Sequence, residues 1–256
     1  MVDLHSHVLP GLDDGARSLE QAVHMVKIAA ASGTTDLVAS PHCNLEYSFD
    51  PGVVEAGLRE LARASGGPVR LHYGCDFHFY FENIQDALRN PSRYTIAHGR
   101  YLLVEFPDVL IPHATDEIFD RFIQAGIIPI VTHPERNFLL HARLEQMERW
   151  VRAGVLMQVT AQSFLGRFGR EPRRFARELM LRGMVHIVAS DAHDPEDRTP
   201  RLDIAFEHVS KTYGDAWAQA LFVANPRAAL NGEPLPALPP VVRRRRWFRF
   251  WASAGA

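Results

Sequence analysis

The stretch Val2-Asp3-Leu4-His5-Ser6-His7 opens the chain and decides how the rest of it is interpreted. Its apolar residues, Val2 and Leu4, indicate a short buried strand. Side chains two apart on a strand point to the same face, so His5 and His7 are predicted to lie together. Two imidazoles at the end of a strand form half of a metal site, and a packed or surface histidine pair is the alternative. The sequence further along the chain decides between these two interpretations.

A helix-glycine-strand unit recurs through the chain. In most units the helix ends at a glycine, the residue that best adopts the left-handed conformation just past a helix. Each predicted strand is a near-continuous apolar run, as expected for a strand buried on both faces. The glycines are Gly33, Gly67, Gly126, Gly154 and Gly183, and the predicted strands are residues 2–7, 36–42, 69–76, 101–106, 127–133, 155–160 and 185–191.

Seven strands alternating with helices predict a parallel sheet in an α/β protein. An open, doubly wound sheet is one alternative, but it usually carries a glycine-rich phosphate turn after an early strand, and this sequence has none. We therefore predict a closed or nearly closed (β/α)7 barrel, a relative of the eightfold TIM barrel. The barrel with its C-terminal helices is expected to occupy residues 1–230, followed by a proline-rich linker at 231–242 and a basic, aromatic tail at 243–256.

The composition is that of an ordinary globular protein. Of the 256 residues, 46% are apolar and 23% are charged, and the net charge of −2 does not point to nucleic acid. The two cysteines, Cys43 and Cys75, are too few for a disulfide scaffold, so we expect free thiols in a reducing cytoplasm. Neither a signal peptide nor an apolar run long enough for a transmembrane helix is predicted.

Metal-ligating side chains finish six of the seven predicted strands, always at the carboxyl end. In parallel α/β barrels this end carries the chemistry. Mixed imidazole and carboxylate ligands suit zinc, manganese or iron, and nine ligands are enough for two or three ions. Two ions about 3.5–4 Å apart can activate water and stabilise the leaving oxygen of an in-line displacement. The candidates are His5, His7, His42, Asp76, Glu105, His133, Asp191 and His193, with Asp13 or Asp14 from the first loop as the ninth.

Two arginines follow predicted ligands closely. Arg136 comes just after His133, and Arg198 lies in the loop past Asp191. A guanidinium beside a cationic cluster needs an anion between them, and its paired donors suit two phosphate oxygens. We therefore predict that both arginines bind substrate phosphate and stabilise the transition state. Salt bridges with Glu135 or Asp197 are the alternative.

His78 follows Asp76 by two residues, so it is predicted to support the ligands or to line the substrate pocket. The aromatic residues around it suit a pocket for an aromatic substrate or the hydrophobic core. They are Phe77, Phe79, Tyr80 and Phe81.

Taken together, the motifs resemble the polymerase and histidinol phosphatase (PHP) superfamily. More narrowly, they resemble the bacterial PHP-class protein-tyrosine phosphatases of capsule and exopolysaccharide gene clusters. The resemblance covers about residues 1–230. It rests on residues 3–15 (DLHSHVLPGLDDG), 40–42 (SPH), 73–76 (YGCD), 104–106 (VEF), 133–136 (HPER) and 188–193 (VASDAH).

This resemblance implies a distorted (β/α)7 barrel with a trinuclear site that favours manganese, with iron, zinc, cobalt or magnesium as alternatives. It implies that Asp14 rather than Asp13 is the loop ligand, and that Arg136 and Arg198 contact phosphate. The implied substrates are phosphotyrosines on a membrane-associated bacterial tyrosine kinase that controls polysaccharide synthesis. One departure is Asp76, where some members carry Glu, and a shorter carboxylate could change the bridging geometry or the preferred metal.

The sequence also bears on functions other than that of a tyrosine phosphatase. A cysteine-based phosphatase needs an arginine six residues after its cysteine, but Phe49 and Phe81 stand at those positions here. Another PHP phosphoesterase, such as a histidinol phosphate phosphatase or an exonuclease, is the first alternative, although the near-neutral charge disfavours a nuclease. A metal-stabilised, non-enzymatic scaffold that binds a kinase is the second.

The tail at 243–251 joins four arginines to a cluster of Trp and Phe residues. Arginine attracts anionic lipids and tryptophan favours the headgroup region, so the tail predicts peripheral contact with the inner face of the membrane. A disordered solubilising tail, or arginines bound to the acidic barrel, are the alternatives.

Overall fold

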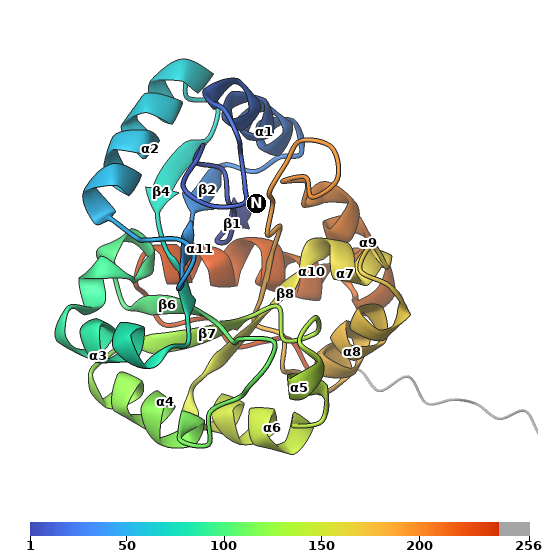
Figure 1. Ribbon diagram of the computed structural model, residues 1–256. Helices are drawn as coiled ribbons and strands as arrows, with labels where there is room; N and C mark the ends of the chain where they lie inside the picture. The colour runs from blue at the N-terminus through green and yellow to red at the C-terminus, as the bar shows by residue number, and fades with distance from the viewer. Residues whose placement is uncertain (241–256) are drawn as a thin grey trace, which may run out of the picture.

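The computed structural model describes residues 1–240, so the predicted tail at 243–256 and the end of the linker lie outside the described residues. Figure 1 shows the strands gathered at the centre of the molecule, with most helices arranged around them. The strands are β1 (Val2–Asp3), β2 (Asp36–Ala39), β3 (His42–Cys43), β4 (Arg70–Tyr73), β5 (Asp76–His78), β6 (Tyr101–Glu105), β7 (Ile128–Thr132), β8 (Leu156–Thr160) and β9 (Ile187–Ala189).

All strand pairs in residues 1–240 are parallel and form two sheets, ordered β1-β2-β4 and β3-β5-β6-β7-β8-β9. The sheets are continuous through the chain because β2 leads into β3 and β4 leads into β5. At the other edge, an isolated parallel bridge joins Ser6 to Ala192, beside β1 and β9. The seven predicted strands are thus present around one ring, two of them each broken into two short pieces.

The ring is irregular beside β4. Only β2 pairs with β4, and the next segment along the ring at this level is the short 3-10 helix η2 (Ile96–His98). The strand β6 begins after that helix and pairs with β5 instead. The predicted α/β barrel is therefore confirmed, with a local distortion where a helical turn replaces strand pairing.

Helices follow the strands as the repeated unit predicts. Ser18 accepts a hydrogen bond from the Gln21 backbone at 3.2 Å and so caps the first helix, whereas the Gln21 side chain accepts from the Arg17 backbone. The helices are α1 (Leu19–Ala31), α2 (Pro51–Ser65), α3 (Phe81–Arg89), η1 (Pro91–Arg93), α4 (Thr115–Gln124), α5 (Phe138–His141), α6 (Leu144–Ala153), α7 (Ala161–Leu165), α8 (Arg170–Leu181), α9 (Asp203–Tyr213), α10 (Asp215–Gln219), η3 (Ala220–Ala224) and α11 (Asn225–Leu230). The predicted helix-terminal glycines all have positive φ.

The pleat of the strands separates two hydrophobic clusters. On β6, Tyr101 and Leu103 belong to the smaller cluster, whereas Leu102 and Val104 belong to the larger one. The smaller cluster also draws residues from β1, β7, β9 and α11, so it fills the amino-terminal part of the ring. Because side chains alternate along a strand, Glu105 shares the phase of Tyr101 and Leu103 and points to the same inner side.

None of the helices in residues 1–240 is long and apolar enough to cross a membrane.

Candidate metal centre

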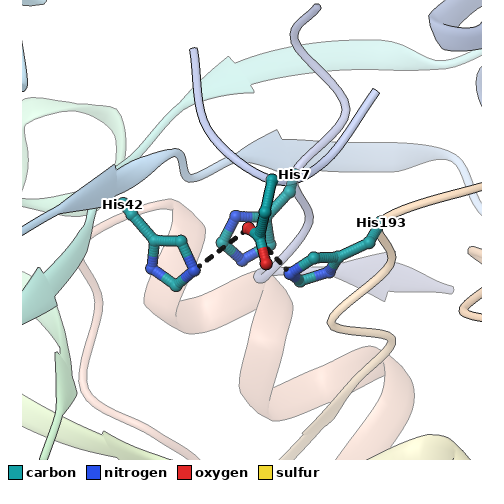
Figure 2. Close-up of side chains that lie close together, drawn as sticks. His7, His42 and His193 are labelled. Carbon is teal, nitrogen blue, oxygen red and sulfur yellow. Dashed lines mark ion pairs between the residues drawn. The ribbon is translucent and has the colours of Figure 1, made fainter. Parts of the chain in front are cut away.

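All nine predicted ligands come together at the carboxyl ends of the strands. Their nitrogen and oxygen atoms fall into four overlapping groups, and within each group the ligand atoms lie within 4.8 Å of one another. Figure 2 shows His7, His42 and His193 turned toward one another from three separate segments. The groups are His7, Asp14, His42 and His193; His42, Asp76, His78 and Glu105; His5, His7 and Asp76; and His5, His133 and Asp191.

The rings of His5 and His7 aim their free nitrogens at each other. Their Nε2 atoms are 3.2 Å apart, and both side chains are buried. The Nδ1 atom of His5 lies 2.8 Å from Gln158 Oε1, and that of His7 lies 2.6 Å from Asp13 Oδ2. Because these oxygens accept hydrogen bonds from Nδ1–H, each ring directs its Nε2 atom at the cluster and, when neutral, would present a lone pair there. Two converging lone pairs in a buried site suit a bound cation.

The two loop aspartates occupy different positions. Asp13 lies behind His7 and also accepts a hydrogen bond from the His42 backbone at 3.0 Å. Asp14 lies at the mouth, where its Oδ1 atom is 3.4 Å from His42 Nε2 and 3.3 Å from His193 Nε2. These positions suit Asp14 to bind an ion and Asp13 to orient an imidazole.

The carboxylate of Asp76 has no hydrogen-bond partner, although it is fully buried. Its Oδ2 atom lies 3.0 Å from His42 Nδ1 and 3.5 Å from His5 Nε2, close enough for ion pairs but without hydrogen-bond geometry. Glu105 Oε2 and His42 Nδ1 are also buried without hydrogen bonds. Leaving such groups unpaired is costly, so these atoms fit metal ligands better than structural polar groups.

The charges of the cluster compensate one another. Burial alone would lower the pKa of His5, but the carboxylates of Asp76 and Asp191 raise it to about 9. Burial likewise favours neutral Asp76, yet His5 and His42 hold its pKa well below the usual range. Burial and Arg136 lower the pKa of His133 to about 4, which keeps that imidazole neutral. The carboxylates are thus ionised and His133 is neutral, as metal binding requires, whereas His5 carries a proton that a bound ion would displace.

Both predicted arginines contact Asp191. Arg136 donates from one guanidinium nitrogen to Asp191 Oδ2, and Arg198 donates to the same oxygen at 2.6 Å. The alternative partners make other contacts. Glu135 accepts from Ser163 Oγ at 2.6 Å, and Asp197 pairs with Arg167. The two guanidinium groups therefore lie together at one edge of the ligand cluster, as expected if both bind the same phosphate.

His78 lies inside the cluster rather than outside it. Its Nε2 atom contacts Glu105 Oε2, and its ring is stacked on Tyr80 with centroids 5.7 Å apart. This position makes His78 a tenth candidate ligand beside its predicted contact with substrate. Of its aromatic neighbours, Phe77 and Phe79 are core residues, whereas Phe81 is 71% exposed.

Two of the predicted ligands have unusual backbones. His133 and Asp191 have φ values of 33° and 52°, in the left-handed region that side chains with a Cβ atom rarely adopt. A left-handed backbone conformation at such a residue costs about 1–2 kcal/mol of free energy, and it persists only where the surrounding structure fixes it. His133 directly follows β7 and Asp191 comes two residues after β9, so these sharp turns direct their side chains into the cluster.

Gln158 was not among the predicted site residues; it lies in the middle of β8, the strand without a predicted ligand. Its amide is fully buried, and Oε1 contacts His5. The sequence signal for this residue is a polar amide within the apolar run 155–159. Gln158 lies on the same face of the strand as Leu156, which packs against the smaller hydrophobic cluster inside the ring.

A small cavity of about 100 Å³ opens beside the ligands, between the segments that follow β6 and β7. Glu105, His133 and Arg136 line it together with Asp108 and Asn137. A water molecule takes about 30 Å³ of the liquid, so the cavity has room for a small anion such as phosphate.

The fold and the site together define an α/β barrel with a candidate metal centre at the carboxyl ends of its strands. The family model described as capsular polysaccharide synthesis, CpsB/CapC, matches residues 1–231, and the chain belongs to this family. CapC of Staphylococcus aureus is 32% identical over 255 residues, covering 97% of this chain and 99% of that protein. The tyrosine-protein phosphatase YwqE of Bacillus subtilis is 30% identical and covers 98% of this chain and 100% of its own length.

The solved structures agree with this assignment. Crystal structures of YwqE from Bacillus subtilis and CpsB from Streptococcus pneumoniae are described as those of unique metal-dependent tyrosine phosphatases. The match has a TM-score of 0.86 at 28% identity, covering 95% of this chain and 100% of the solved chain. The lactonase Lmo2620 of Listeria monocytogenes shares the fold alone, with a TM-score of 0.52 at 10% identity over 91% of this chain and 92% of its own.

Proposed function

We propose that this protein is a metal-dependent protein-tyrosine phosphatase, a hydrolase of phosphoric monoesters. The observation that carries the proposal is the paired imidazoles of His5 and His7, which aim two lone pairs into a cluster where Asp76 is buried without a hydrogen bond. The names of the relatives YwqE and CpsB support it. Two or three divalent ions would occupy the site, with manganese favoured. Their ligands would be His5, His7, Asp14, His42, Asp76, Glu105, His133, Asp191 and His193, with His78 as an additional candidate.

When bound, the ions would supply an activated water and positive charge at the phosphoryl group. The protein's own contribution would come from Arg136 and Arg198, whose guanidinium donors would hold the phosphoryl oxygens and stabilise the charge that develops on them. Asp191 Oδ2 accepts hydrogen bonds from both arginines. Tyrosinate has a pKa near 10, so it leaves without needing a strong general acid.

A covalent cysteine mechanism does not fit the chain. Cys75 is fully buried, and burial raises its pKa well above the ordinary value. Cys43 is buried as well, and neither thiol has an arginine six residues further on. Direct hydrolysis by water is the remaining route.

The proposed substrate is a phosphotyrosine on a membrane-associated tyrosine kinase that regulates capsule or exopolysaccharide synthesis. Membership of a family named for capsular polysaccharide synthesis supports this choice. We also propose that the chain works at the cytoplasmic face of the membrane, with the tail at 243–251 in contact with anionic lipid. If the full chain and a chain ending at Pro240 float equally with anionic liposomes, the lipid contact is refuted.

The test of the function combines metal analysis with a substrate comparison on one preparation. Elemental analysis should find two or three divalent ions per chain, and a phosphotyrosyl peptide should be hydrolysed faster than histidinol phosphate or single-stranded DNA. His42→Ala and Asp191→Ala should abolish turnover of p-nitrophenyl phosphate with the fold retained. His24→Ala, which removes an exposed histidine of α1 that belongs to none of the candidate ligand groups, is the matched control. Full activity after complete metal removal would refute the proposal.

A further inference from the structure

We propose that Phe168 is a positioning residue, which holds the guanidinium of Arg136 by its face so that the edge of the group is free to bind substrate phosphate. The inference rests on the proposed function, because it takes Arg136 as a phosphate-binding residue.

The contact between these two residues is a cation-π interaction. The guanidinium carbon of Arg136 lies 4.4 Å from the centroid of the Phe168 ring. Arginine characteristically stacks on an aromatic ring through the flat face of its guanidinium, whereas its hydrogen-bond donors all lie in the plane of the group. Phe168 can therefore fix the orientation of Arg136 without occupying any of the donors that a phosphate would need. The side chain of Arg136 also lines the small cavity beside Glu105 and His133.

A second partner of Arg136 is less suited to this task. Asp191 Oδ2 accepts hydrogen bonds from both Arg136 and Arg198, and Asp191 is itself a proposed metal ligand. A cation bound to Asp191 would weaken its attraction for the arginines, since the positive charges repel one another. The ring of Phe168 carries no charge that a metal ion could neutralise. It would thus continue to hold Arg136 when the site is loaded.

The segment that carries Phe168 is built to reach both arginines. It is the four-residue connection Gly166-Arg167-Phe168-Gly169 between α7 and α8, and both glycines have positive φ, 84° and 97°. The neighbouring Arg167 donates to Asp197 Oδ1 at 2.6 Å, and Asp197 directly precedes Arg198.

Further contacts hold the loop of Arg198 in place. Gln162 of α7 donates to the carbonyl of Asp197 at 3.0 Å, and Asp194 accepts from the Arg198 backbone at 3.1 Å. The connection after α7 thus contacts one phosphate-binding arginine directly and the loop of the other through Asp197. The Arg167–Asp197 pair is exposed and contributes little by itself, so Phe168 is the residue to test.

The experiment measures binding of inorganic phosphate to the metal-loaded full chain by calorimetry, together with kcat and KM for a phosphotyrosyl peptide. Phe168→Leu should weaken phosphate binding and raise KM by about three- to tenfold, because an aliphatic side chain offers no π face. Phe168→Tyr should retain wild-type binding. Phe138→Leu is the matched control, since Phe138 is a 70% exposed aromatic residue that follows β7 and, among the described residues, makes no cation-π contact with either arginine. If Phe168→Leu does not fold, Phe168→Met takes its place.

A double-mutant cycle with Arg136→Ala separates positioning from general structural damage. Phe168→Leu should cause no further loss of phosphate binding once Arg136 is absent. Equal phosphate binding by Phe168→Leu and wild type, or the same loss with and without Arg136, would overturn the inference. If the wild-type chain does not hydrolyse phosphotyrosine, the proposed function fails, whereas the phosphate measurement still tests Phe168.

Discussion

Gln158 Oε1 lies 2.8 Å from His5 Nδ1. The strand β8, which carries no predicted metal ligand, thus orients a predicted metal ligand that belongs to the first strand segment. Both side chains are fully buried. The contact fixes the proton on Nδ1 and turns Nε2 toward His7 and the carboxylates. The first strand could not by itself impose this orientation, because an imidazole without a partner is free to rotate about its side-chain torsions.

Gln158→Leu should reduce metal affinity about 10- to 100-fold, because the His5 ring loses the acceptor that sets its tautomer. The measurement is the ion retained per chain during dialysis against graded chelator. Gln158→Glu keeps an acceptor oxygen at the same place and is the control, with affinity near that of wild type. Unchanged metal retention in Gln158→Leu would show that His5 is oriented by other contacts.

Asp13 and Asp14 should respond differently to the same substitution. Asp14→Asn should lower the number of ions bound per chain, since a proposed ligand oxygen beside His42 and His193 loses its charge. Asp13→Asn should leave the number unchanged but weaken binding, because Asp13 contacts His7 Nδ1 and the His42 backbone, and so orients these ligands without binding an ion. Elemental analysis at saturating and at limiting manganese distinguishes the two. The opposite pattern would make Asp13 the ligand.

The sequence predicts the order of strands well because glycines and apolar runs report local backbone preferences. It also places the ligands, since the carboxyl ends of parallel strands meet at one face of a barrel. It does not predict that two strands break in the middle or that η2 interrupts pairing beside β4, because these depend on how distant segments meet.

The supporting residues of the site were harder to predict. Gln158, and the use of Phe168 against Arg136, depend on contacts between side chains far apart in the chain. The left-handed backbones of His133 and Asp191 contradict local preference, and only the assembled site explains them.

Removing the metal should lower the stability of the fold as well as activity. Without cations, the carboxylate of Asp76 is buried without a hydrogen bond, and oxygens of Asp76 and Asp191 each lie 3.5 Å from His5 Nε2. An ion whose free concentration is 100 times its dissociation constant adds about 2.7 kcal/mol to the free energy of unfolding. Thermal melts with and without excess chelator measure the difference, and restoring manganese should reverse it. An identical melting temperature in both conditions would mean that no ion stabilises the folded chain.

A separate ion-pair cluster joins the start of the barrel to its end. The carboxylate of Asp36 in β2 is 1% exposed and accepts from Arg70 of β4 at 2.8 Å and from Arg227 of α11 at 2.5 Å. His72 Nε2 lies 2.9 Å from the same carboxylate. Burial would raise the pKa of Asp36, but the hydrogen bonds from Arg70 and Arg227 outweigh it and hold the pKa below its ordinary value.

Asp36→Asn should therefore lower the free energy of unfolding by about 2 kcal/mol at pH 7, since it removes a buried acceptor from charged donors. A carboxylate whose pKa is lowered by folding stabilises the protein at pH values above the pKa of the unfolded chain, which is about 4. This contribution is lost as the pH falls from about 4 toward the lower pKa of the folded protein. The difference between wild type and Asp36→Asn should be constant from pH 6 to about 8 and shrink below about pH 4. Chemical denaturation across this range measures it, with Glu171→Gln in the exposed Arg174 pair as a control that should change little. A difference that stays the same at low pH would show that Asp36 acts through its shape and hydrogen bonding rather than through its charge.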